Sequence, residues 1–196
     1  MTERDAGATG FVVAGGRSER MGRDKALLPW AGATLLEHAL LRLRAVCADV
    51  RILCGARPRY TGFGVPVHTD VVVDAGPLGG VHAGLLNLDR PLGLFLGVDT
   101  PFVPLPLLAA LGAAAGGFDA VVPLVGGRPE PLCAVYRRTC LEAVQRRLAA
   151  GERKMTSFWP DIRVRTVAEE ELSAFGDPAE MFRNLNTPGE YRRRRG

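Results

Sequence analysis

Several features that mark special classes of protein are missing from these 196 residues. No apolar stretch approaches the roughly 20 residues that a membrane-spanning helix needs. The four cysteines show neither a CxxC nor a zinc-finger spacing, so we expect them to be buried and reduced. Charged residues at positions 3–5 stand where a signal peptide would have its apolar run. The sequence therefore predicts a soluble, cytoplasmic protein with no membrane partner.

Lysine is scarce, since Lys25 and Lys154 are the only two in the chain. The formal net charge of +4 equals the contribution of the four arginines at 192–195. A basic tail can bind nucleic acid, but a solvated, mobile C-terminus is the simpler interpretation. No basic stripe interleaved with aromatic residues occurs elsewhere. We therefore expect no nucleic-acid partner.

The overall composition is that of one globular domain. Apolar residues make up 47% and charged residues 23%, both near globular averages. At roughly 150 residues per domain, this length suggests a single core. We expect a flexible N-terminus over residues 1–9, one domain over residues 10–191 and a flexible basic tail over residues 192–196. Disordered, collagen-like and disulfide-stapled classes are excluded.

Short apolar runs alternate with longer helical patterns along the chain. The predicted strands are residues 10–14, 50–54, 65–69, 94–98, 120–125, 132–136 and 163–167. The predicted helices are residues 34–46, 78–87, 104–115 and 138–149. This alternation predicts an α/β fold, a single-domain three-layer α/β/α sandwich with a mostly parallel, Rossmann-like sheet.

Ligands of such sheets bind at the carboxyl ends of the strands, which tells us where to look for a site. The segments concerned begin at Gly15, Cys54, Asp70 and Asp99. The stretch GGRPEP at residues 126–131 is expected to be a loop between two strands, forming a lip over the site.

The strongest motif is AGGRSERMGRDK at residues 14–25, directly after the first buried strand. It is neither a Walker A loop nor a GxGxxG fingerprint. Its glycines nevertheless allow backbone N–H groups to approach phosphate oxygens, while Arg20 and Lys25 supply positive charge. A glycine-rich turn without function is the alternative. The length of the loop and the rarity of lysine favour a phosphate-binding site.

Asp99, in the segment GVDTP, ends another buried strand. An unpaired carboxylate is costly there, so it either caps the following turn or binds a cation at the surface. Mg²⁺ commonly takes one or two carboxylates together with substrate phosphates. Taken together with the phosphate-loop motif, the metal is the favoured interpretation.

The motif at residues 14–25 resembles the signature of nucleotidyltransferases built on a Rossmann-like sandwich. It is most similar to that of the MobA-type molybdenum cofactor guanylyltransferases. Further segments fit the family in order, and the resemblance spans roughly residues 10–191. These segments are Asp70 with GPLGG at 76–80, VDTP at 98–101, PL at 131–132 leading to Tyr136, and NLNTP at 184–188.

The resemblance implies transfer of GMP from GTP to a molybdopterin-type cofactor, with Mg²⁺ as cofactor and pyrophosphate as the second product. It also implies transient contacts with proteins that deliver or accept the molybdenum cofactor. The implied catalytic residues are Lys25, Arg20 and Asp99, with Asp99 as the metal ligand. The implied nucleotide- and cofactor-binding residues are Ala14, Gly15, Gly16, Lys25, Asp70, Gly79, Asp99, Asn184 and Asn186, with the two asparagines on the acceptor side.

One position departs from the family pattern. The family has asparagine at the end of the second strand, where this chain has Cys54. This departure leaves open a related cytidylyltransferase, or another nucleotidyltransferase that acts on a phosphorylated acceptor. A non-catalytic carrier of nucleotide or cofactor is the other alternative. The combination of Lys25 and Asp99 argues against a carrier, because holding a ligand requires no transfer metal.

Overall fold

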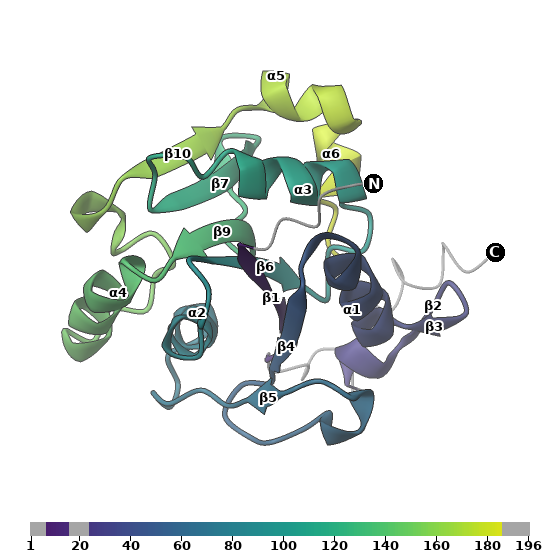
Figure 1. Ribbon diagram of the computed structural model, residues 1–196, viewed down its shortest axis with the longest axis horizontal. Helices are drawn as coiled ribbons and strands as arrows, with labels where there is room; N and C mark the ends of the chain where they lie inside the picture. The colour runs from purple at the N-terminus through teal and green to yellow at the C-terminus, as the bar shows by residue number, and fades with distance from the viewer. Residues whose placement is uncertain (1–6, 16–23, 186–196) are drawn as a thin grey trace.

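The computed structural model describes residues 7–15 and 24–185 of the chain (Figure 1). Three predicted site residues, Gly16, Arg20 and Asn186, lie outside the described residues. The basic tail over residues 192–196 also lies outside them. The first strand starts at Ala8, two residues before its predicted start at residue 10.

The core of the fold is one sheet with the strand order β10-β7-β9-β6-β1-β4-β5. Its strands are β1 (Ala8–Val13), β4 (Asp49–Leu53), β5 (Val67–His68), β6 (Leu92–Gly97), β7 (Ala120–Val125), β9 (Cys133–Arg137) and β10 (Val164–Val167). β1 pairs in parallel with β4 and β6, β5 with β4, and β10 with β7. Only β9 runs antiparallel within this order, between β6 and β7. The predicted mostly parallel sheet is confirmed.

Two short pairings add to this sheet. β8 (Arg128–Pro129) pairs antiparallel with the end of β7, so the expected loop over residues 126–131 is in fact a tight hairpin. β2 (Pro29–Trp30) and β3 (Ala33–Thr34) form a separate hairpin before the first long helix. Sequence patterning did not indicate either of them, because two residues show no periodicity.

Four longer helices cover the two faces of the sheet. They are α1 (Leu35–Val46), α2 (Pro77–Leu86), α3 (Leu105–Ala113) and α4 (Cys140–Ala149), each within two residues of its predicted start and end. Figure 1 shows α1 and α3 on one side of the sheet and α2 and α4 on the other. Two further short helices, α5 (Glu169–Leu172) and α6 (Pro178–Met181), follow β10. The three-layer sandwich is therefore as predicted.

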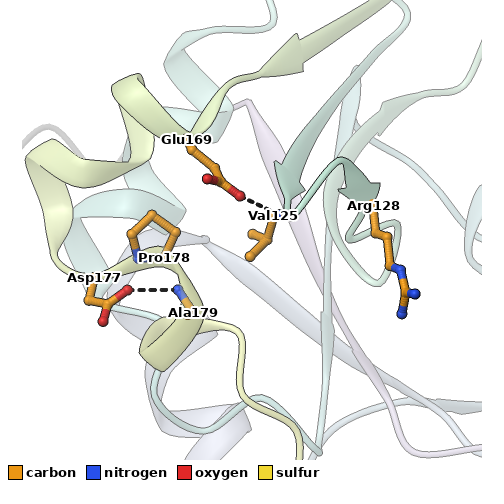
Figure 2. A pocket seen from close by; sticks show the side chains of 7 residues that line it. Val125, Arg128, Glu169, Asp177, Pro178 and Ala179 are labelled. Carbon is orange, nitrogen blue, oxygen red and sulfur yellow. Dashed lines mark hydrogen bonds between the residues drawn. The ribbon is translucent and has the colours of Figure 1, made fainter.

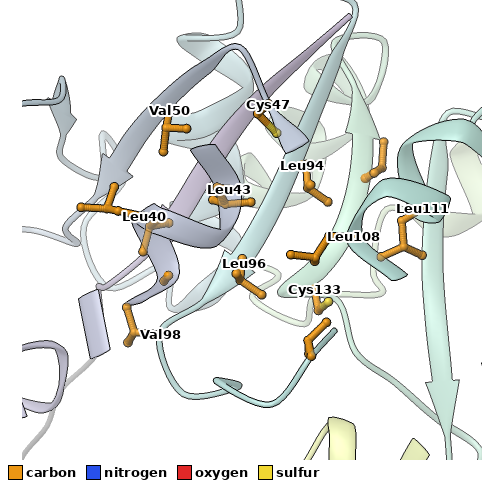
Figure 3. Packing of buried hydrophobic residues seen from close by; sticks show 14 of the residues in the cluster. Leu40, Leu43, Cys47, Val50, Leu94, Leu96, Val98, Leu108, Leu111 and Cys133 are labelled. Atoms are coloured by element: carbon orange, nitrogen blue, oxygen red, sulfur yellow. The ribbon is translucent and has the colours of Figure 1, made fainter. Parts of the chain in front are cut away.

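Each face of the sheet has its own apolar core. Figure 3 shows one of them, in which Leu40 and Leu43 of α1 and Leu108 and Leu111 of α3 lie over the central strands. On the other face, the rings of Phe11 and Phe95 stack with centroids 4.9 Å apart. Strands buried on both faces need continuous apolar runs, which is the pattern that the sequence shows.

Two expectations from the sequence concern the state of the cysteines and the absence of a membrane-spanning helix. Cys47, Cys54, Cys133 and Cys140 are all buried and none forms a disulfide, as predicted. Among residues 7–15 and 24–185, no helix combines the length and apolar character needed to cross a bilayer.

Candidate active site

The segments that follow β1, β4, β5 and β6 meet at the carboxyl edge of the sheet. The Ala14 amide donates to the Leu53 carbonyl at 2.9 Å, which joins the ends of β1 and β4. The Asp70 amide donates to the Gly55 carbonyl, also at 2.9 Å, which joins the segment after β5 to the segment after β4. The sheet thus gathers here the segments that sequence reasoning selected.

Gly15 meets Gly55 at this edge in backbone-to-backbone contact. A Cβ atom on Gly15 would lie 2.5 Å from the Gly55 nitrogen, closer than real Cβ atoms approach any heavy atom. Gly55 has a φ of +77°, a conformation that glycine adopts at little cost. Both positions therefore require glycine, and the glycine-rich loop begins directly against the end of β4.

Lys25 and Asp99 bring opposite charges together from positions 74 residues apart. Lys25 begins the 3₁₀ turn Lys25–Leu27, and its Nζ lies 3.4 Å from Asp99 Oδ2. The Lys25 side chain is 14% exposed and that of Asp99 33% exposed. The pair is thus sheltered but within reach of a ligand. The cation that pairs with Asp99 in this structure is therefore the Lys25 ammonium.

The turn that carries Asp99 is fastened to helix α1. The Pro101 carbonyl accepts hydrogen bonds from His38 Nε2 and from the Arg42 guanidinium, each at 3.2 Å. Burial lowers the pKa of His38, and the hydrogen bond to Pro101 partly opposes that shift. His38 belongs to helix α1, and the sequence analysis did not select it as a site residue. In the structure it helps to fix the position of the Asp99 turn.

Glu130 is a second carboxylate in the neighbourhood of Asp99. Burial raises the pKa of Glu130 to about 7, and the negative charge of Asp99 adds to the effect. A cation held at Asp99 would therefore favour the ionised form of Glu130. Sequence reasoning missed this residue. Its position just before strand β9, whose first residue lies at the carboxyl edge, was the signal that could have found it.

Asp70 lies against the first turn of α2. Its Oδ2 would be 3.3 Å from a Cβ placed on Gly79, so the glycine leaves room for the carboxylate. Burial raises the pKa of Asp70, and no described residue hydrogen bonds to its Oδ1. A buried acceptor oxygen of this kind suits a hydroxyl or N–H group of a ligand.

The C-terminal part of the chain returns to the same place after α6. The Leu185 amide donates to the Asp99 carbonyl at 3.1 Å, which brings the neighbouring Asn184 beside the Asp99 turn. The contacts at this edge thus join all seven of the predicted site residues that the structure describes. These are Ala14, Gly15, Lys25, Asp70, Gly79, Asp99 and Asn184.

A pocket of about 460 Å³ opens farther along this edge, at the end of β7 (Figure 2). The β7–β8 hairpin forms one wall and helices α5 and α6 form the other. Glu169 joins the walls by accepting from the Gly126 amide. The described residues that line this pocket do not include Lys25, Asp70 or Asp99, so the pocket is not the centre of the candidate site. The lining residues are Val125, Gly126, Arg128, Glu169, Asp177, Pro178 and Ala179.

The donor set at Asp99 fits a metal that is shared with a substrate. Within the described ranges, no group of three or more His, Cys, Asp or Glu side chains could enclose an ion. Mg²⁺ does not need such a cage, because one or two carboxylates and the phosphates of a substrate commonly complete its shell. The ammonium of Lys25 already lies beside Asp99, so the site accommodates positive charge.

The chain is similar in sequence and in fold to proteins of a known family. Residues 10–165 match the MobA-like NTP transferase domain. A probable molybdenum cofactor guanylyltransferase of Pelotomaculum thermopropionicum is 36% identical over 93% of this chain and 89% of its own length. The molybdenum cofactor guanylyltransferase of Desulfosudis oleivorans is 34% identical over 93% and 91%. The crystal structure of molybdopterin-guanine dinucleotide biosynthesis protein A from Archaeoglobus fulgidus superposes with a TM-score of 0.79 at 25% identity, covering 94% of this chain and 95% of that chain.

Proposed function

Because this chain belongs to the MobA-like NTP transferase domain family, we propose that it transfers GMP from GTP to a molybdopterin-type molybdenum cofactor. The products are the guanine dinucleotide form of the cofactor and pyrophosphate. The names of the similar proteins support the substrates. The observation that carries the proposal is the Lys25–Asp99 pair beside the Gly15 turn, at the edge where such sheets bind ligands.

The reaction is a displacement at the α-phosphorus of GTP. A phosphate oxygen of the acceptor forms a new P–O bond, and the bond to the β-phosphate oxygen breaks, so pyrophosphate leaves with the electron pair. A phosphomonoester has a second pKa of about 6, so the attacking oxygen is largely ionised near neutral pH and needs no general base. The protein therefore contributes mainly orientation and compensation of charge.

The proposed roles follow the family resemblance and, for the residues that the structure describes, their positions at the carboxyl edge of the sheet. Ala14, Gly15 and Gly16 contact the nucleotide through their backbone. Lys25 and Arg20 offset the negative charge on the departing pyrophosphate. To do so, the Lys25 ammonium leaves Asp99 and pairs with phosphate oxygens instead. Asp70 accepts from the guanosine part through Oδ1, close to Gly79, and Asn184 and Asn186 contact the acceptor.

We propose Mg²⁺ as the cofactor, held by Asp99 with Glu130 nearby. When bound, Mg²⁺ neutralises charge on the phosphate oxygens that it coordinates. The Asp99 carboxylate is held for this role by its turn, which His38 and Arg42 fix through the Pro101 carbonyl. We also propose that the protein is cytoplasmic and that it makes transient contacts with proteins that deliver or accept the molybdenum cofactor.

Cys54 keeps a cytidylyltransferase as the second candidate function. Its side chain is fully buried, and Sγ donates to the His68 carbonyl at 3.2 Å. The thiol therefore faces the protein, and base selection has to rest on other groups. The second candidate differs from the first proposal in the nucleotide that it binds, and its acceptor is another phosphorylated compound or the same cofactor.

Calorimetric titration with GTP, CTP, ATP and UTP, with and without Mg²⁺, tests the choice of nucleotide. We expect selective binding of GTP that Mg²⁺ strengthens, because each unmatched buried hydrogen bond costs about 1–3 kcal/mol. Preference for CTP would move the protein to the second candidate. Binding of none of the four would contradict the site.

Substitution Asp99→Ala separates an enzyme from a carrier. We expect transfer of GMP to be lost, with the far-UV circular dichroism spectrum unchanged, because the metal would lose its protein ligand. Glu142→Ala, in the exposed ion pair of Glu142 with Arg146 on α4, serves as the control and should transfer at the wild-type rate. Undiminished transfer by Asp99→Ala would refute the assignment of the metal.

A further inference from the structure

A cluster of polar side chains joins the loop after β4 to the residue that precedes Lys25. The Tyr60 hydroxyl lies 2.8 Å from both carboxylate oxygens of Asp24 and donates to them. The Arg59 guanidinium donates to Asp24 Oδ2 at 3.2 Å. One carboxylate thus receives hydrogen bonds from two neighbouring side chains of another segment.

The loop holds Tyr60 in an uncommon backbone conformation to make this contact. Its φ of +66° and ψ of +29° lie in the left-handed region, which bulky side chains rarely adopt. The side chain is nevertheless packed, since the residue is only 9% exposed. Strain of this kind persists where the surroundings fix it, and it concentrates at functional sites.

Arg59 ties the same cluster to the sheet. Besides its bond to Asp24, it donates to the Cys54 carbonyl at 3.1 Å, directly after the last residue of β4. Its guanidinium also lies 5.1 Å from the centre of the Tyr60 ring. The donors to Asp24 are therefore fixed relative to the strand end that Gly15 contacts through Gly55.

Asp24 in turn fixes the start of the turn that carries Lys25. Its Oδ1 accepts from the Ala26 amide at 3.1 Å and caps the 3₁₀ turn Lys25–Leu27. Lys25 is the first residue of that turn, and its Nζ is 3.4 Å from Asp99 Oδ2. A shift of Asp24 would carry the backbone of Lys25 with it, so the path from the β4 loop to Asp99 is continuous.

We propose that Tyr60 and Arg59 are positioning residues that hold Lys25 in place through Asp24. The inference rests on the proposed function, because it explains the contacts between the loop after β4 and Asp24 by the phosphate-binding role proposed for Lys25. Neither side chain takes part in bond making. Their hydrogen bonds set where the Lys25 ammonium lies when a nucleotide triphosphate binds.

The test removes the hydroxyl of Tyr60 while keeping its ring. We expect Tyr60→Phe to lower kcat/KM about ten-fold, the effect of losing one hydrogen bond to a charged group. The same change should weaken GTP binding in the presence of Mg²⁺. Asp24→Asn, which keeps the capping oxygen, should show a loss of similar size if Tyr60→Phe proves unstable.

A matched control exists at the opposite edge of the sheet. The Thr139 hydroxyl donates to Asp119 Oδ1 at 2.7 Å, just before β7 begins. Thr139→Val removes a hydroxyl-to-carboxylate bond of the same kind, far from Lys25 in the strand direction. We expect wild-type kcat/KM and wild-type GTP binding from this variant, whatever its melting temperature.

Coupling to Lys25 separates positioning from a general loss of stability. In a Lys25→Ala background, Tyr60→Phe should change GTP binding by less than two-fold, because the group being positioned is gone. An equally large loss in both backgrounds, or wild-type behaviour of Tyr60→Phe alone, would overturn the positioning role while leaving the proposed function intact. Failure of the wild-type protein to bind GTP or to transfer GMP would instead contradict the proposed function, and the positioning role with it.

Discussion

Lys25 and Asp99 compensate each other's charge in the ligand-free protein. A bound metal ion would instead compensate the charge of Asp99, and a bound nucleotide phosphate would compensate that of Lys25. The ammonium lies 3.4 Å from the carboxylate and both side chains are sheltered. A cation at Asp99 and a phosphate at Lys25 therefore each replace an existing interaction. Binding of one ligand would free the residue that the other ligand contacts, which gives a physical reason to expect that the proposed metal and nucleotide bind together.

Substitution Lys25→Gln should raise the affinity of the nucleotide-free protein for Mn²⁺. The competing ammonium is removed, and partly exposed ion pairs of this kind are worth up to about 1 kcal/mol, so we expect a two- to five-fold tighter Kd by electron paramagnetic resonance titration. Lys154→Gln removes the other lysine and should leave the Kd unchanged. Equal affinities of wild type and Lys25→Gln would show that Lys25 does not compete with the metal.

Glu130 predicts a specific dependence of stability on pH. Its pKa rises from 4.5 to about 7 on folding, mainly through burial and secondly through Asp99. The folded protein then binds a proton more tightly than the unfolded chain, so Glu130 costs stability as pH rises from about 4.5 to about 7.

Substitution Glu130→Gln should therefore stabilise the protein more at pH 8 than at pH 5. Glu130 is only partly buried, so solvent screens the effect, and we expect a gain in the free energy of unfolding of roughly 1–2 kcal/mol. Urea denaturation at the two pH values measures it. A gain that is the same at both pH values would show that Glu130 titrates normally in the folded protein.

At the scale of elements, the junction between β1 and β4 has the strictest packing at the site. A Cβ on Gly15 would lie 2.5 Å from the backbone nitrogen of Gly55, just beyond the ends of the paired strands β1 and β4, so the backbone would have to shift. Gly15→Ala should cost roughly 1–3 kcal/mol of unfolding free energy in urea. Gly112→Ala, in α3 with open space around the added methyl, should be neutral or stabilising by up to about 1 kcal/mol. Similar values for the two variants would contradict the close approach.

The long elements could be predicted because their patterns are strong and local. Seven strands and four helices were predicted from short apolar runs and helical spacing, and the structure has each of them. Of the seven, β5 and β10 are only partly buried. Short elements could not be found in this way. The turn of the β2–β3 hairpin depends on positive φ angles at Ala31 and Gly32. These backbone angles are set in the folded chain and are not evident from the sequence pattern. The Asp177–Pro178 pair, a cap followed by a first-turn proline, is a sequence signal for α6, but a helix of four residues shows no periodicity.

The direction of β9 had a signal in the sequence as well. β7 ends at Val125 and β9 begins at Cys133, a connection too short for the crossover of a dozen or more residues that parallel neighbours need. The antiparallel pairing followed from that length. By contrast, the contacts of Tyr60 with Asp24 and of His38 with Pro101 join distant positions, and no local pattern predicts them.

At the scale of the whole molecule, the candidate site is where several chain segments are held together. The ends of β1 and β4, the segment after β5, the Asp99 turn and the returning Leu185 backbone all meet there. A ligand that contacts several of these segments at once binds only the folded protein, so binding energy becomes stability. This coupling offers a test that needs no molybdenum cofactor.

GTP with Mg²⁺ should raise the melting temperature of the full chain. At a concentration of 100 times Kd the ligand contributes about 2.7 kcal/mol. For a protein of this size each kcal/mol corresponds to roughly 2–4 °C, so we expect a shift of about 5–10 °C by differential scanning calorimetry. Asp99→Ala should lose the part of the shift that Mg²⁺ adds, and CTP should give a smaller shift than GTP. Equal shifts with all four nucleotides would show that the site binds the triphosphate without selecting the base, which would leave GTP unexplained as the substrate.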